Sequence, residues 1–209
     1  MALVALALTA PLASALGAEL GLMPGSDLGL KGKSTLHAFE AKASKLDVTF
    51  HSDPAAWPAG VTGGEAVERV IRARGVTAMD VVVAVSGLRS GKDGLDKNMW
   101  KALLAEKHPE IRFAMQSYEV QDSAATGEMA ITAKGPLTVA GVDRDITMAV
   151  VAHRDGETVK LHGSVALLMT QFGIKPPTMM LGAIKTADEI TVEFDLVIGA
   201  NGNAVTKAE

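Results

Sequence analysis

The amino-acid sequence predicts a mainly β protein, an antiparallel β-barrel of about eight strands with one principal helix near residues 94–107. Two observations lead to this fold class. Apolar and polar residues alternate with period two through most of the chain, which is the pattern of strands with one buried face. One stretch in the middle of the chain instead shows helical spacing. Because a long antiparallel sheet closes or folds over to hide its edges, we expect one apolar interior.

Residues 1–18 are predicted to be a signal peptide that is cleaved from the mature chain. Leu3–Leu12 is an apolar run, and it is followed by the small-x-small cleavage motifs Ala13–Ala15 and Ala15–Gly17. No Lys or Arg occurs before Lys31, so the basic n-region of such a signal is missing. The run is too short to span a bilayer comfortably. We therefore expect an exported protein with no membrane span after cleavage.

The mature chain is expected to form a single domain. Residues 19–33 are interpreted as an irregular lead-in that contains Pro24, the barrel is expected over 34–199, and 200–209 is expected to be a flexible tail. A Pro- and Gly-rich loop is predicted at 53–64. The alternating segments that predict the strands are 34–43, 46–50, 79–85, 111–115, 129–139, 146–152, 159–169 and 190–198.

The principal helix is predicted inside residues 87–113, between two strands. Asp93 can cap its N-terminus, and Pro109 stops it at His108. A second, short helix is favoured over Glu65–Arg74 by apolar residues at helical spacing. The residues that share one face of the principal helix are Leu95, Met99, Ala102 and Leu103.

Composition and charge argue against several classes of function. The 20 Lys and Arg residues are scattered among 24 acids for a net charge of −4, whereas nucleic-acid binding needs a concentrated basic face. The chain has no cysteine, which excludes a disulfide framework, a thiol nucleophile and a Cys-based metal site. Ten methionines suit either an ordinary core or an adaptable apolar pocket.

No catalytic or metal-binding motif stands out. The closest metal-like pair, His51 and Asp53, is interpreted as a surface turn, and the five histidines form no His-Glu-x-x-His motif. Gly29–Ser34 has the wrong spacing for a phosphate loop and precedes a strand. Asp143 and Asp145 are interpreted as solvated charges at a hairpin. We therefore expect no enzyme, no metal and no cofactor.

Several motifs in order resemble the YceI-like family, lipocalin-like β-barrels of the bacterial periplasm that bind polyisoprenoids or related long-chain lipids. The resemblance covers roughly residues 34–199. It departs from the family at Gly94–Met99, where typical members carry an R-D-x-H-L stretch, and at the insert 53–75. The matching segments are Ser34–Lys42, Val81–Ser90, Leu95–Met99, His108–Phe113, Gly135–Val142, Gln171–Ile174 and Glu189–Leu196.

The resemblance agrees with the barrel predicted from the residues and implies a periplasmic or secreted, non-catalytic protein. It would sequester or carry a long-chain apolar ligand such as a polyisoprenoid, an isoprenoid quinone or a similar lipid. Met99 and Trp100 are expected to close one end of the cavity, and Phe172 to lie at the mouth with Pro176–Met180. The residues expected to line the cavity are Phe113, Met115, Met148, Val150, Leu167, Met169, Val192 and Phe194.

Two other functions remain open at this point. A barrel with a solid core would serve as a periplasmic protein-interaction or stress-related module, using a strand edge or the loop at Met179–Leu181. A hydrolase or isomerase acting on a lipid would need a polar pocket residue, and the sequence offers no obvious one. A homodimer is compatible with each function.

Overall fold

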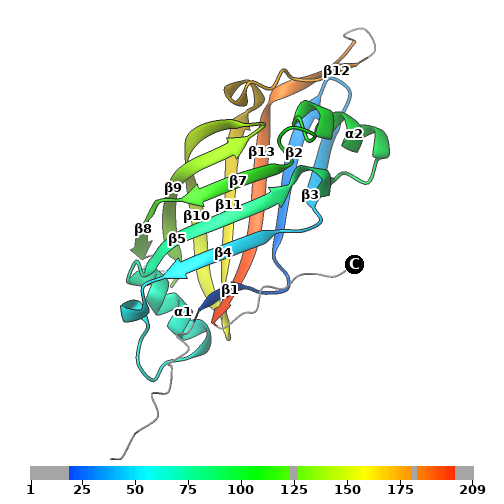
Figure 1. Cartoon of the computed structure of the whole chain (residues 1–209). Helices are drawn as coiled ribbons and strands as arrows, with labels where there is room; N and C mark the ends of the chain where they lie inside the picture. The colour runs from blue at the N-terminus through cyan, green and yellow to red at the C-terminus, as the bar shows by residue number, and fades with distance from the viewer. Residues whose placement is uncertain (1–18, 123–126, 180–182, 201–209) are drawn as a thin grey trace, which may run out of the picture.

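The strands form one curled antiparallel sheet (Figure 1). The computed structural model describes residues 19–122, 127–179 and 183–200, so the predicted signal peptide at 1–18 and all but the first residue of the predicted tail lie outside the described residues. The elements in chain order are β1 (Leu20–Leu22), β2 (Asp27–Ser34), β3 (Ala38–Ala43), β4 (Asp47–Ser52), η1 (Pro54–Ala56), α1 (Gly63–Arg72), β5 (Val76–Ala84), η2 (Val85–Gly87), β6 (Leu88–Arg89), α2 (Asp93–Ala102), β7 (Glu110–Met115), β8 (Ser117–Asp122), β9 (Met129–Val139), β10 (Val142–Asp155), β11 (Thr158–Leu168), η3 (Met169–Phe172), β12 (Thr178–Met179) and β13 (Ile184–Ala200).

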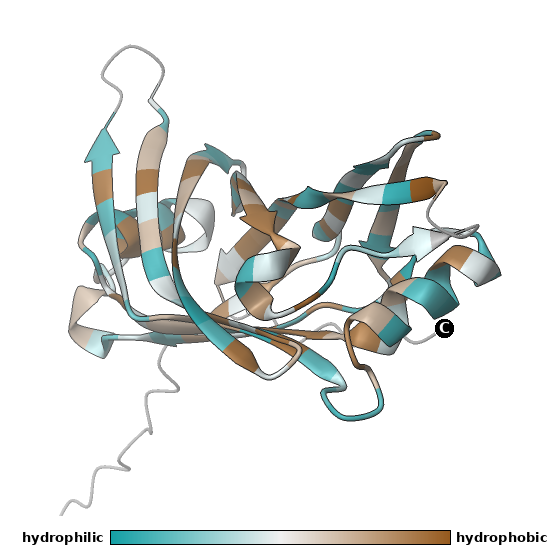
Figure 2. Cartoon of the chain, turned by 90° about the horizontal axis from the view of Figure 1, so that it is seen from above, coloured by the Kyte–Doolittle hydropathy of each residue, from teal (hydrophilic) through white to brown (hydrophobic). Residues whose placement is uncertain are grey.

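The predicted fold class is confirmed. The sheet runs in the order β4-β5-β7-β9-β10-β11-β13-β2-β3-β6, with β1 and β12 added beside β13 and β8 beside β9. Seen from above, the strands curve around a common interior as a half-barrel (Figure 2). The described residues hold 13 strands rather than about eight, because short strands such as β6 and β12 have too few residues to show alternation.

Both predicted helices are present, one toward each end of the half-barrel (Figure 1). The short helix expected at Glu65–Arg74 is α1, which packs against β10, β11 and β13. The principal helix, α2, ends at Ala102 instead of continuing to residue 107. Leu104 takes a left-handed conformation (φ 56°), and its carbonyl accepts from the amides of Lys107 and His108 in a tight turn. The spacing of apolar residues does not reveal this turn, so the predicted helix was too long at its C-terminal end.

The prediction of an irregular lead-in at 19–33 was wrong. These residues form β1 and nearly all of β2, and β2 pairs with both β3 and β13. Gly32, within this segment, is buried in the strand, and a Cβ there would collide with Phe39 and Ile190. Glycine here allows two large side chains to pack across the sheet. The barrel therefore begins at β1, not at residue 34.

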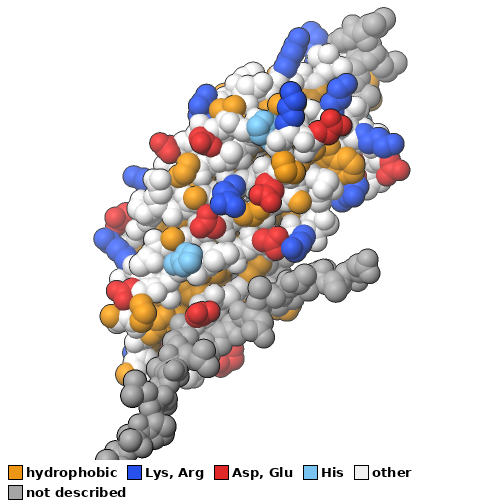
Figure 3. Space-filling model, viewed as in Figure 1, with side chains coloured by type: hydrophobic (Ala, Val, Ile, Leu, Met, Phe, Trp, Pro, Cys, Tyr) orange, Lys and Arg blue, Asp and Glu red, His pale blue; other side chains and the backbone are white. Residues whose placement is uncertain are grey.

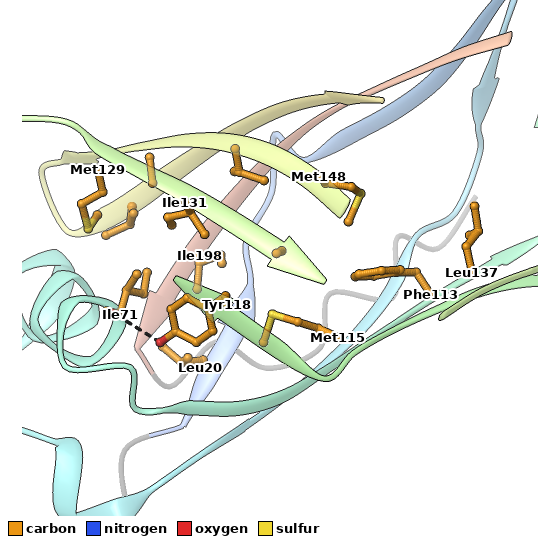
Figure 4. Packing of buried hydrophobic residues seen from close by; sticks show 14 of the residues in the cluster. Leu20, Ile71, Phe113, Met115, Tyr118, Met129, Ile131, Leu137, Met148 and Ile198 are labelled. Carbon is orange, nitrogen blue, oxygen red and sulfur yellow. Dashed lines mark hydrogen bonds between the residues drawn. The ribbon is translucent and has the colours of Figure 1, made fainter. Parts of the chain in front are cut away.

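A tightly packed core fills the end of the half-barrel that α1 covers (Figure 4). Val67 and Val70 of α1 are completely buried against it. Tyr118 lies in the middle of this core, where its hydroxyl donates to the carbonyl of Ile71 (3.0 Å) and accepts from the amide of Val76 (3.3 Å). Burial raises the pKa of the Tyr118 hydroxyl, which keeps it protonated as a donor.

Charged side chains fasten α1 to the sheet around this core. Glu68 of α1 forms ion pairs with Arg72 of the same helix (2.8 Å) and with Arg154 of β10 (2.9 Å). Only 17% of the Glu68 side chain is exposed, so solvent screens these two pairs less than the surface pairs elsewhere. The lower end is therefore closed by both packing and charge.

The first prediction concerns Tyr118. Replacement with Phe leaves the ring in place but removes the acceptor for the partly buried amide of Val76 and the donor to the carbonyl of Ile71. We expect the free energy of unfolding to fall by about 1–3 kcal/mol, as for an unsatisfied buried polar group. Urea denaturation measures this change, with an unchanged m-value as the control for an intact native state. A loss below about 0.3 kcal/mol would show that the hydroxyl does not hold α1.

Candidate ligand-binding cavity

The other end of the half-barrel is hollow. A cavity of about 550 Å³ lies between the inner face of the sheet and α2, within the size range of pockets that bury a small ligand. The solid-cored barrel that the sequence left open is therefore not what the described residues form. The apolar lining comprises Leu28, Leu30, Leu36, Phe39, Met79, Val81, Val83, Leu88, Leu95, Met99, Ala102, Leu103, Ile111, Phe113, Leu137, Val139, Met148, Val165, Leu167, Leu168, Met169, Phe172, Ile174, Pro177, Ile184, Ile190, Val192, Phe194 and Leu196.

Exposure of the inward-facing side chains distinguishes the hollow end from the packed end. On β11, Val159 at the packed end is completely buried, whereas Val165 and Leu167 on the same face are only half-buried. Val192 and Phe194 of β13 are also half-buried although they face inward. These side chains border empty space instead of an opposite layer, so a wall of apolar atoms is left for a ligand to cover.

Three buried side chains form the floor of the cavity. Phe113, Leu137 and Met148 belong both to the packed core and to the cavity lining, as do Val139, Phe172 and Ile174. Figure 4 shows them at the boundary of the cluster, with Met115 and Tyr118 on the packed side. The floor therefore separates a solid lower half from an open upper half.

The structure brings together eight of the eleven residues that the sequence predicted for the binding site. Met115 and Val150 do not line the cavity, because they lie in the packed core below its floor. Trp100 is on α2 but points to β6, where its Nε1 donates to the carbonyl of Leu88 (3.0 Å). The predicted residues that line the cavity are Met99, Phe113, Met148, Leu167, Met169, Phe172, Val192 and Phe194.

Sequence reasoning missed one wall of the cavity. Leu28 and Leu30 of β2 line it, but they lie in the segment that was interpreted as irregular. Their alternation was the available signal, and the glycines at positions 29 and 32 hid it. At the predicted mouth, Pro177 lines the cavity, whereas Met180 lies outside the described residues.

The polar side chains of the lining lie in three places: around the β2–β3 turn, at the beginning of β13, and on α2 together with Lys92 immediately before it. His37 is the first example: its Nδ1 donates to the carbonyl of Ala38 (3.0 Å), and the ring borders the cavity. Ser34 closes the turn, because its hydroxyl donates to the carbonyl of His37 and accepts from two turn amides. The polar side chains of the lining are Ser34, His37, Lys92, Asn98 and Thr186.

A short set of polar contacts holds α2 over the cavity. The carboxylate of Asp96, buried on α2, accepts from the amide of Ser90 (2.8 Å) and from its hydroxyl (2.5 Å). These hydrogen bonds lower the pKa of Asp96, and the guanidinium of Arg89, 4.0 Å away, adds to the effect. Arg89 also stacks 4.5 Å above the ring of Trp100. Trp100 therefore attaches α2 to β6 on the side away from the cavity. The apolar residues of α2, such as Leu95 and Met99, face the cavity.

No group of three or more His, Cys, Asp or Glu side chains among the described residues is arranged to hold a metal ion. None of the helices in that part of the chain combines the length and the hydropathy needed to cross a membrane.

A half-barrel that is solid at one end, hollow and apolar at the other, and covered by a helix defines a lipocalin-like binding fold. The chain belongs to the YceI-like family, because the model of the YceI-like domain matches residues 26–198. This match begins inside the segment that was interpreted as an irregular lead-in, in agreement with β2.

Solved structures share this fold at low sequence identity. A polyisoprenoid binding domain from Saccharophagus degradans has a TM-score of 0.61 at 13% identity, over 88% of this chain and 98% of that chain. BcnA from Burkholderia cenocepacia has a TM-score of 0.59 at 16% identity, over 82% and 95%. The YceI protein of Campylobacter jejuni has a TM-score of 0.52 at 17% identity, over 82% and 85%. A comparison with curated proteins gives no match.

The second prediction concerns the tether of α2. In Asp96→Asn we expect the amides of α2 to exchange with solvent at least about tenfold faster, because the charged acceptor of the two Ser90 bonds is lost. Hydrogen–deuterium exchange measures this, and Asp93→Asn, at an exposed position of the same first turn, is the matched control.

The pH dependence of this tether follows from the lowered pKa of Asp96. A carboxylate whose folded-state pKa is lowered stabilises the fold above its unfolded value, and this stability is lost as the pH falls through the folded value. Protection of α2 in the wild type should therefore persist at neutral pH and disappear only below the ordinary aspartate range. Equal exchange in the two variants would contradict a role for Asp96.

Proposed function

We propose that this chain is an exported, non-catalytic protein that sequesters or carries a long-chain apolar ligand in its cavity. The ligand class we propose is a polyisoprenoid, an isoprenoid quinone or a similar lipid. The observation that carries the proposal is the set of half-buried, inward-facing apolar side chains around a hollow of about 550 Å³. A structural neighbour described as a polyisoprenoid binding domain supports the ligand class.

The physical basis of binding would be transfer of hydrocarbon out of water. Each CH₂ group that enters the cavity contributes about 0.8 kcal/mol, so a chain of about ten carbons contributes roughly 8 kcal/mol. Association opposes this with a loss of freedom of about 4–15 kcal/mol, which depends on how ordered the bound chain becomes. A long flexible ligand thus needs many apolar contacts and few polar ones, in keeping with the composition of this lining.

The alternative is an enzyme whose catalytic residues lie in the cavity wall, and the lining does not favour it. Among the described residues that line it, the ionisable side chains are His37 and Lys92, and both are exposed. Among the described residues, neither side chain hydrogen-bonds to a carboxylate or hydroxyl side chain that could complete a catalytic pair, and the ring of His37 bonds to a backbone carbonyl. A binding role requires no such pair.

Export to the periplasm or the medium is part of the same proposal. It rests on the apolar run and the cleavage motifs within residues 1–18. The mass of the protein recovered from the periplasm of a bacterial host would test it, because cleavage removes a peptide of defined mass.

The third prediction is the identity of the cargo. We expect native mass spectrometry of the exported protein to reveal a bound lipid at one per chain, and organic extraction to release an isoprenoid or related lipid. Loss of this ligand should lower the melting temperature, because a ligand that binds only the folded state stabilises it. A protein without bound mass, and without a mass shift on addition of quinones or polyprenols, would contradict the proposal.

The fourth prediction separates the cavity from the core by a matched pair on β11. Val165→Trp places a large ring in the hollow, so we expect at least about a tenfold loss of affinity for a polyprenol, with stability changed by less than about 1 kcal/mol. Val159→Trp makes the same change in the packed core and should destabilise the fold by about 1–3 kcal/mol or more. Ligand titration and urea denaturation measure the two effects. Unchanged affinity in a folded Val165→Trp would place the ligand elsewhere.

A further inference from the structure

Lysines surround the open end of the cavity. We define the mouth surface as residues 33–37, 91–103, 168–179 and 183–188, which contribute most of the lining at that end. Its segments are joined by hydrogen bonds between the β2–β3 turn and β13, where the amide of Thr35 donates to the carbonyl of Lys185 (2.9 Å). The lysines of the mouth surface are Lys33, Lys92, Lys97, Lys101, Lys175 and Lys185.

The charge of the mouth surface is opposite to that of the rest of the chain. Its six lysines and three aspartates give +3, although the whole chain carries −4, so the remainder carries −7. Figure 3 shows Lys and Arg side chains gathered at the upper end of the molecule, around α2. Such a separation of charge orients the open end toward a negatively charged surface.

The lysines of the mouth surface also differ from most other lysines in their contacts. Among the described residues, none of the six forms an ion pair, whereas four of the six described lysines elsewhere, Lys31, Lys42, Lys45 and Lys160, pair with carboxylates at 2.5–3.0 Å. Their charge is therefore not neutralised locally.

Exposed leucines accompany these lysines. Leu36, at the tip of the β2–β3 turn, is 67% exposed, and Leu168, at the end of β11, is 39% exposed. Both also line the cavity, so apolar surface continues from the interior over the edge of the mouth. Leucine and lysine together are the side chains of surfaces that lie in the interface of a bilayer.

We propose that the mouth surface docks on a lipid bilayer that contains anionic lipids, with Leu36 and Leu168 in the interface and the lysines against the headgroups. This inference rests on the proposed function, because docking would let an apolar ligand pass between bilayer and cavity without crossing water. A bilayer fits better than a protein partner, since the feature is a ring of unpaired like charges around an apolar opening and not a shaped polar surface.

The test is flotation of the full mature protein with vesicles. Vesicles of phosphatidylethanolamine and phosphatidylglycerol should bind the protein at least about tenfold more strongly than vesicles of phosphatidylcholine alone. Binding should weaken as salt rises from about 0.05 to 0.5 M, because salt screens exposed charges. Absence of binding, or equal binding to both compositions, would overturn the proposal and leave a protein partner as the occupant of this surface.

Charge reversal at two positions identifies the face that docks. Lys175→Glu with Lys185→Glu should reduce binding to the anionic vesicles at least about tenfold. The matched control is Arg112→Glu with Lys134→Glu, which makes the same change of charge at exposed positions of β7 and β9 and should lower binding less than about threefold. An equal loss in the two variants would mean that net charge alone matters, and would overturn the assignment of the mouth.

Leu36→Asp provides an independent variant, since an exposed turn residue is not needed for folding. It should reduce flotation at least about fivefold, whereas Val151→Asp, at an exposed apolar position of β10, should not. Affinity for a soluble short-chain polyprenol, measured without vesicles on the Lys175 and Lys185 double variant, separates the two proposals. Neither lysine lines the cavity, so retained affinity with lost flotation supports docking, and absence of affinity in the wild type refutes the proposed function instead.

Discussion

Beside Phe113, Leu137 and Met148 the packing across the half-barrel gives way to a cavity, and the other properties of the molecule depend on that boundary. Below this boundary, α1 packs against the sheet as an opposite layer. The hydroxyl of Tyr118 links α1 to β5, because it hydrogen-bonds both to the carbonyl of Ile71 and to the amide of Val76. The chain's own side chains therefore fill the lower half, without a contribution from a ligand. The upper half is then free to remain hollow, which a uniformly packed barrel of the same length would not allow.

The hollow half needs a cover that is attached at few points. Apart from its apolar face, α2 is held through Asp96, Trp100 and the short strand β6. Polar contacts at one side of a helix fix its position without filling the space beneath it. A ligand in the cavity would contact Met99 directly, while the helix stays attached to the edge of the sheet. Few contacts also mean low local stability, which is where opening motions are expected.

Alternation in the sequence predicted the class of fold, both helices and the inward face of most strands, because these depend on local periodicity. It did not predict how far along each strand the packing extends. Val150 and Met148 occupy the same face of β10, yet only Met148 reaches the cavity, and this difference arises from α1 far away in the sequence. β2 was missed for a similar reason. Position 32 requires glycine because Phe39 and Ile190 of other strands occupy the space of a Cβ, and this is not visible in the local sequence. How deeply each inward-facing side chain is buried depends on contacts with distant parts of the chain, which local periodicity does not encode.

A hollow lined by half-buried apolar groups lowers stability in the free protein, because those groups lack the contacts that a filled core would give them. The packed lower half, with Val67 and Val159 fully buried, offsets this cost at a distance from the cavity. A bound apolar ligand would restore the missing contacts, so stability and occupancy would rise together. Selection for binding would then act on the upper half and selection for folding on the lower half. Substitutions on the two sides of the floor should consequently change different properties of one continuous sheet.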